Sequence, residues 1–201
     1  FLRPIGETEF VAGLYDTIAS GGQNLCQGII GYADLELGQK IGDALDAHIE
    51  AGKGKFKGIR RGLYWSGDQA VYDHVSIRPR AGLMLDRNFR SGFAQLQPRG
   101  LTFDAVLFHP QLTELANLAK SFPDTIIVLN HVGFKLGVGR YLNDREQVFK
   151  EWRNGLKLVS DCPNVMVKIG GLGMKIWGFG VENNKEDHKK LVSDLKNLNF
   201  I

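Results

Sequence analysis

The chain has 201 residues, of which 43% are hydrophobic and 23% are charged, and its formal net charge is +3 at pH 7. These values are typical of a globular protein with one sizeable domain and a real core. The basic residues are scattered, without the sustained basic stripe that nucleic-acid binding requires, and no run approaches the ~20 apolar residues that span a bilayer. We therefore expect a single domain over residues 1–201 that acts on neither nucleic acid nor membranes.

The two cysteines, Cys26 and Cys162, are far apart and form no C-x-x-C pair. This pattern excludes a disulfide framework and a zinc knuckle, and it is typical of small core residues in a reducing compartment. No signal peptide is visible at the start of the sequence. We expect a cytoplasmic location.

Short apolar runs alternate with longer amphipathic stretches along the whole chain. In chain order, the predicted strands are residues 25–32, 56–60, 101–108, 125–131 and 164–169. The predicted helices are residues 7–19, residues 37–51, a short helix with Thr113 as its N-cap, and a longer one that starts at Asn143, where Glu146 completes a capping box, and runs to Val159.

The order of these elements predicts the fold class. Strands that are apolar on both faces and alternate with helices are typical of an α/β fold with a parallel sheet and right-handed crossovers. Five strands are too few for a closed (β/α)8 barrel, which takes about 250 residues. The pattern thus predicts either an open doubly wound sheet or a barrel with its ends missing.

A glycine-rich stretch follows the last predicted strand. Residues 170–180 contain five glycines, so we expect a loop there, on the side of the sheet where the strands end. Residues 182–199 are polar and rich in lysine, with a weak helical stripe that predicts a surface helix.

His131 is the strongest candidate for a catalytic residue. The apolar run from Thr125 ends at this histidine and then breaks into a glycine-rich loop. In an α/β barrel the carboxyl ends of the strands form the reactive face, so the position favours chemistry over packing. The alternative is an imidazole that caps the strand and bonds only to backbone groups.

Three basic residues lie in or just after other strands. Side chains alternate along a strand, so Arg60 and Arg61 must face opposite sides, and we expect Arg60 to point inward. Lys168 is a lone cation in an apolar run. Such cations can bind a substrate carboxylate or stabilise an oxyanion, whereas the alternative is a salt bridge or snorkelling at the rim.

Other polar residues near strand ends have weaker signals. His109 and Gln111 follow the third predicted strand, and we expect both of them, with Arg61, to contact substrate; His109 could equally cap the next helix. Asp104 lies inside an apolar strand, which is costly unless it is paired, so we expect it to pair with a strand arginine as core scaffolding. We expect no catalytic role for the remaining histidines: His48, His74 and His188.

These segments, taken together and in this order, resemble the amidohydrolase-related family, in particular its lactonase-like branch of metal-dependent hydrolases. The resemblance extends from residue 6 to about residue 180. The segments that carry it are GETEFVAG (6–13), GYADL (31–35), FKGIR (56–60), GLTFD (100–104), FPDTIIVLNHVG (122–133) and NVMVKIGGL (164–172).

The resemblance implies a (β/α)8 barrel whose active site begins with a His-x-His pair on the first strand. It also implies a histidine on the strand that here ends at His131, and an acidic residue on the last strand. Among these positions only His131 has a counterpart in this sequence, as a metal ligand or an orienting group. Arg60 and Lys168 match basic positions that the resemblance suggests face the substrate.

The departures from the family pattern are also informative. The sequence has no His-x-His, and no acidic final strand follows Lys190. We therefore expect an incomplete barrel with about five of the eight βα units, lacking the first two strands and the last. Residues 181–201 no longer resemble the family and form a divergent tail.

The function that the resemblance implies is hydrolysis of a lactone or a related cyclic ester or amide by an activated water. A divalent metal, with zinc the first candidate, would activate that water, although metal-independent relatives exist. The expected partners are a small-molecule substrate and further copies in a homo-oligomer. The alternatives are a decarboxylase of the same superfamily or a barrel remnant that only binds; we expect this stretch alone to be inactive.

Overall fold

The computed structural model describes residues 3–19, 27–180 and 189. Its centre is one five-stranded, fully parallel sheet in which the strands follow each other in sequence order. The strands are β1 (Ile29–Gly31), β2 (Phe56–Gly62), β3 (Thr102–Val106), β4 (Ile127–Asn130) and β5 (Val165–Lys168). Every strand predicted from the sequence is confirmed, and most are shorter than predicted because the run of apolar residues continues into the flanking turns.

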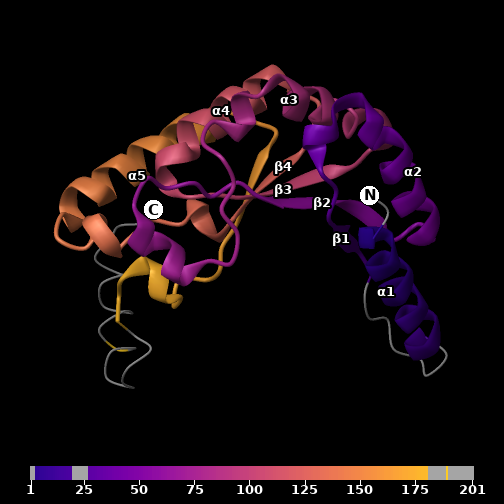
Figure 1. Cartoon of the computed structure of the whole chain (residues 1–201), viewed down its shortest axis with the longest axis horizontal. Helices are drawn as coiled ribbons and strands as arrows, with labels where there is room; N and C mark the ends of the chain where they lie inside the picture. The colour runs from indigo at the N-terminus through magenta and orange to yellow at the C-terminus, as the bar shows by residue number, and fades with distance from the viewer. Residues whose placement is uncertain (1–2, 20–26, 181–188, 190–201) are drawn as a thin grey trace.

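Helices connect the strands. They are α1 (Arg3–Ala19), α2 (Gly42–Ala51), α3 (Arg87–Phe93), α4 (Leu112–Ser121) and α5 (Arg145–Ser160). Helices α2 to α5 form a continuous arch along one side of the sheet (Figure 1). This arrangement argues against a doubly wound sheet, in which helices cover both faces, and it is that of a barrel wall.

The two faces of the sheet differ in chemistry. The face beneath the helices carries apolar side chains that are fully buried, among them Ile59, Phe103 and Leu129. The residues that alternate with them, such as Arg60 and Asp104, are on the opposite face, which corresponds to the inside of a barrel. The described part of the chain is thus an incomplete (β/α)8 barrel, and the apolar core lies between its sheet and its helices.

The predicted helix starts need four corrections. Helix α1 starts at Arg3 and not at residue 7. Residues Leu35–Ile41 form a 3₁₀ segment broken at Gly38 (φ 62°), so α2 starts only at Gly42 and not near residue 37. Helix α4 starts at Leu112, because a 3₁₀ turn at His109–Gln111 already winds the chain, so Thr113 is not its N-cap. Asp144, not Asn143, precedes α5, and no side chain caps this helix.

Other predictions have mixed outcomes. Residues 170–180 are a loop, as predicted, with one 3₁₀ turn at Lys175–Trp177. Cys162 is buried, as expected for a core residue, whereas Cys26 and the helix predicted over 182–199 lie outside the described residues, except Lys189. Within the described residues, we find no helix with the length and apolarity needed to cross a membrane.

Candidate active site

Three charged side chains from three strands meet on the face of the sheet opposite to helices α2 to α5, which we call the open face. Arg60 Nη2 donates a hydrogen bond to Asp104 Oδ2 over 2.9 Å, and Lys168 Nζ donates to the same oxygen over 3.0 Å. Asp104 is almost fully buried, whereas the side chains of Arg60 and Lys168 are 47% and 46% exposed. The two cations therefore share one buried anchor and present their remaining donors to solvent. We call these residues, with Asn130, the strand-end cluster.

The cluster explains the charge state of Asp104. Burial alone would raise the pKa of this carboxyl group, but hydrogen bonds from Arg60, Lys168 and Asn130 outweigh burial and hold the pKa below its ordinary value. The prediction that Asp104 pairs with a strand arginine is confirmed. Because two cations face one carboxylate, the cluster keeps one uncompensated positive charge, which suits an anionic ligand or an oxyanion.

His131 directly follows Asn130 at the carboxyl end of β4. Both His131 and Val132 have a positive φ of 53°, a left-handed conformation that costs energy in residues other than glycine and often occurs at functional sites. The buried Nδ1 of His131 has no hydrogen-bond partner among the described residues. The imidazole thus has a free ring nitrogen and is not satisfied by backbone groups at that atom.

Two neighbours hold the His131 ring in place. The ring of Phe134 lies with its centroid 4.8 Å from that of His131. On the loop after β5, Gly171 approaches so closely that a Cβ atom there would be 2.5 Å from His131 Nδ1. In addition, Trp152 Nε1 of α5 donates to the carbonyl of Val132 over 2.8 Å and so anchors the turn His131–Gly133.

The close approach of Gly171 leads to a prediction. Gly171→Ala should displace the His131 ring and lower catalytic turnover about tenfold or more, since misplacement by about 1 Å can cost a hundredfold. Gly82→Ala is the matched control, because Gly82 has a similar φ of 66° and nothing within 4 Å of its would-be Cβ. Both variants should lose about 1–2 kcal/mol of stability from backbone strain. Equal turnover of the two variants would contradict the role of this contact.

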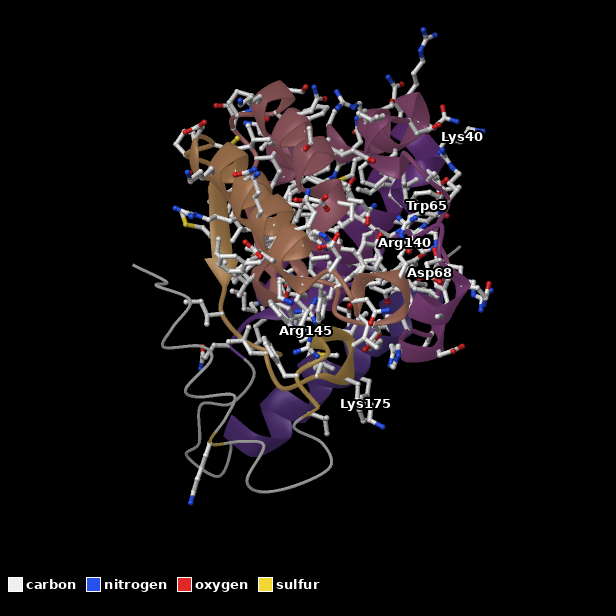
Figure 2. All side chains as sticks on the ribbon, turned by 90° about the vertical axis from the view of Figure 1, so that its left-hand side faces the viewer. Lys40, Trp65, Asp68, Arg140, Arg145 and Lys175 are labelled. Atoms are coloured by element: carbon white, nitrogen blue, oxygen red, sulfur yellow. The ribbon has the colours of Figure 1, made fainter. Side chains whose placement is uncertain are left out.

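The loops that follow β2, β3 and β4 are joined at the same edge of the sheet. Gln111 accepts a hydrogen bond from the Trp65 amide over 2.9 Å and donates to the Leu63 carbonyl over 2.7 Å. Asp68 accepts from the Arg140 amide over 2.7 Å, and the two residues lie near each other in Figure 2. These bonds make the carboxyl ends of the strands a rigid platform for the cluster.

Not all predicted site residues join the cluster. Arg61 points to the opposite face from Arg60, as predicted, and pairs with Glu36 (3.0 Å) and with the hydroxyl of Tyr32. Gln111 is buried and bonded to loop backbone, and His109 is buried beside α5. Their predicted contacts with substrate stay predictions, because no bound molecule is present.

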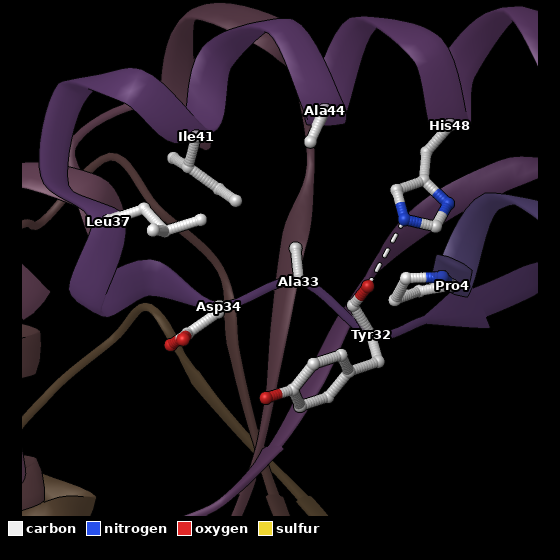
Figure 3. Close-up of a pocket in the computed structure, with 8 residues that line it drawn as sticks. All are labelled: Pro4, Tyr32, Ala33, Asp34, Leu37, Ile41, Ala44 and His48. Carbon is white, nitrogen blue, oxygen red and sulfur yellow. Dashed lines mark hydrogen bonds between the residues drawn. The ribbon is translucent and has the colours of Figure 1, made fainter. Parts of the chain in front are cut away.

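A separate hollow of about 410 Å³ lies near the start of the sheet (Figure 3). It lies between Pro4 of α1, Tyr32 beyond β1, and Ala44 of α2. His48 at its wall donates from Nε2 to the Tyr32 carbonyl (3.1 Å), and its Nδ1 is hydrogen-bonded to Thr8 Oγ1 (2.9 Å). The ring also stacks on Phe56, and the expectation of no catalytic role for His48 stays a prediction.

The residues that the structure describes do not form a metal centre by themselves. Nowhere in residues 3–19 and 27–180 do three or more His, Cys, Asp or Glu side chains converge as metal ligands need to do. His131 offers a free nitrogen, but Asp104 is already engaged with two cations. A metal held by His131 would need its other ligands from outside the described residues.

Sequence reasoning missed Asn130 and gave Asp104 only a scaffolding role. Asn130 is fully buried, donates from Nδ2 to the Val128 carbonyl over 3.2 Å, helps to lower the pKa of Asp104, and leaves its Oδ1 without a partner among the described residues. The signal was available, since both are polar residues inside apolar strands and must have a polar partner. Which partner they find depends on strand order, which the sequence alone left open.

Comparison with known proteins identifies the class. The amidohydrolase family model matches residues 7–192. An uncharacterized protein of Sinorhizobium fredii, y4mH, is 35% identical over 185 residues, which are 90% of this chain and 54% of that protein. The chain therefore spans about half the length of the curated relative it matches.

Solved structures agree with the fold. The crystal structure of an amidohydrolase from Burkholderia multivorans with bound HEPES superposes with a TM-score of 0.63 at 21% identity, over 92% of this chain and 57% of that one. A second crystal form of an amidohydrolase from that organism, with bound zinc, gives a TM-score of 0.59 at 21% identity, over 85% and 52%. This chain belongs to the amidohydrolase family, which confirms the resemblance seen in the sequence.

Proposed function

We propose that this chain is the central part of a hydrolase that opens a lactone or a related cyclic ester or amide, and that this stretch alone is inactive. Family membership supports the hydrolase class. The observation that carries the proposal is the strand-end cluster, in which one buried carboxylate holds Arg60 and Lys168 on the open face, and whose Asn130 directly precedes His131. The lactone is the finer part of the proposal and rests on the lactonase-like sequence pattern.

Each side chain has a role in this proposal. Hydrolysis of a cyclic ester passes through a tetrahedral oxyanion and ends in a carboxylate, so negative charge builds up on the oxygen of the former carbonyl. Arg60 and Lys168 have free donors and one uncompensated positive charge for that oxygen. His131, half-buried at the end of β4, orients the carbonyl or binds a divalent metal, for which zinc is the first candidate.

The alternative function uses the same cluster. A decarboxylase would bind the carboxylate of its substrate at Arg60 and Lys168 and break a carbon–carbon bond, whereas a barrel remnant would bind a carboxylate without turnover. We propose in addition that the protein works in the cytoplasm on a small molecule, as a homo-oligomer, without binding nucleic acid.

The test is a substrate panel with the protein as its gene encodes it, with and without added zinc. Five- and six-membered lactones are followed by proton release, cyclic amides by the amino group that forms, and β-keto acids by release of CO₂. Saturable proton release without CO₂ supports ring opening. CO₂ release would establish the decarboxylase, and saturable binding of carboxylates without either product would establish the remnant.

A further inference from the structure

His109 is bonded twice to the loop that follows His131. Its backbone amide donates to the Phe134 carbonyl over 3.1 Å, and its Nδ1 accepts from the Leu136 amide over 3.2 Å. The imidazole itself is fully buried. One histidine at the end of β3 therefore fixes both ends of the three-residue segment 134–136.

These bonds set the protonation state of His109. Because Nδ1 accepts a hydrogen bond, the proton of the neutral ring must be on Nε2. Burial, together with the nearby charge of Lys135, lowers the pKa of His109 to about 4, so the ring is neutral near pH 7. Its other neighbours are the ring of Tyr141 and the carboxylate of Glu151, whose Oε2 is 3.8 Å from Nε2.

The fixed segment transmits its position to His131. The backbone amide of His109 holds the carbonyl of Phe134. The ring of Phe134 packs against the ring of His131, with 4.8 Å between the two ring centroids. Phe134 also contacts Phe108 and Trp177, so its ring has little freedom. A shift of the 134–136 segment must therefore shift the surface on which His131 rests.

His109 is also placed away from the strand-end cluster. The residue borders a hollow of about 360 Å³ together with Pro110 and Thr113 near the start of α4 and with Glu151 and Asn154 of α5. Both helices belong to the layer that covers the sheet, opposite to the face that carries Arg60 and Lys168.

We propose that His109 is a positioning residue, which acts on His131 through the 134–136 segment, and not a residue that contacts substrate. Its catalytic consequence rests on the proposed function, whereas its structural consequence, the placement of the His131 ring, does not. The atom that matters is Nδ1, as the acceptor for the Leu136 amide, and Nε2 is dispensable.

Two amide variants of His109 test the roles of its two ring nitrogens separately. In His109→Asn the side-chain oxygen can occupy the place of Nδ1, whereas in His109→Gln the amide reaches the place of Nε2 and leaves the Leu136 amide without its acceptor. We expect His109→Gln to lower kcat about tenfold with little change in KM, and His109→Asn to stay within about threefold of wild type. Glu151→Gln, which changes the group that faces Nε2 and leaves the bond at Nδ1 intact, is the control and should leave kcat unchanged.

A lower kcat in His109→Asn than in His109→Gln, with a changed KM, would overturn the proposal. That result is expected if Nε2 contacts substrate, because glutamine keeps a polar group at that place and asparagine does not. Histidine ¹⁵N NMR of the wild-type protein and the variants gives a second measurement that needs no turnover. We expect the Nε2–H tautomer of His109 from pH 5.5 to 8, and a change in the His131 ring signals only in His109→Gln. An Nδ1–H tautomer, or His131 signals that are identical in all variants, would contradict the proposal even if the protein opens no lactone.

Discussion

Replacing His131 by alanine is expected to lower kcat/KM for ring opening at least about a hundredfold and to leave the fold intact, which is the scale for loss of a positioned catalytic group. The residue stands at the carboxyl end of β4 and has a ring nitrogen without a partner among the described residues. The packing that this half-buried ring would lose includes its contacts with Phe134 and Gly171. Steady-state kinetics and a thermal melt of the same preparation measure both effects.

The matched control for this variant is His74→Ala, since His74 is an exposed histidine on the loop after β2. It should change neither kinetics nor melting temperature. If the folded His131→Ala protein turned over lactones at the wild-type rate, the role assigned to His131 would be wrong.

Replacing Asp104 by asparagine is expected to have the second-largest effect. The variant keeps the shape of the side chain but removes the charge to which Arg60 and Lys168 both donate. Breaking a buried ion pair costs about 3–5 kcal/mol, and because both cations are nearly half exposed, we reduce the expected loss of stability to about 1–3 kcal/mol. Turnover should fall about tenfold or more, since the cations lose their common anchor.

The pH dependence of stability gives a sharper reading of Asp104. Because its pKa in the folded protein lies below the ordinary value, its contribution to stability is complete above about pH 4 and is lost as the pH falls through the lower, folded-state pKa. The melting temperature of the wild-type protein should therefore fall more steeply below pH 4 than that of Asp104→Asn. Asp124→Asn, at an exposed carboxylate, is the control, and its curve of melting temperature against pH should parallel that of the wild type. If the curve of Asp104→Asn also parallels the wild type, the cluster does not stabilise the fold.

The strands were predictable from the sequence because their signal is local. Apolar runs such as Thr102–Val106 and Ile127–Asn130 are bounded by turn residues, and side-chain alternation already placed Arg60 and Arg61 on opposite faces. Helix starts were less predictable, since they depend on where a connecting turn ends. The apolar spacing from Leu37 onward continues across the break at Gly38, so it could not show where α2 begins.

The candidate site was predictable in part for a similar reason. A strand end with a histidine or a lone cation is visible locally, and this signal identified His131, Arg60 and Lys168. The contact between Lys168 and Asp104 joins residues that are 64 positions apart, so only the strand order reveals it. The roles of His109 and Gln111 were hidden for another reason: their bonded partners are backbone atoms of other loops, which no side-chain pattern records.

The most direct test of the strand-end cluster as the active site is a crystal structure of the gene-encoded protein with the hydroxy acid formed from its best lactone. We predict that the carboxylate of this product binds to the guanidinium of Arg60 and the Nζ of Lys168, on the open face of the sheet and beside His131. A product carboxylate bound instead in the hollow beside His48, or in the hollow beside His109, would contradict the proposed site.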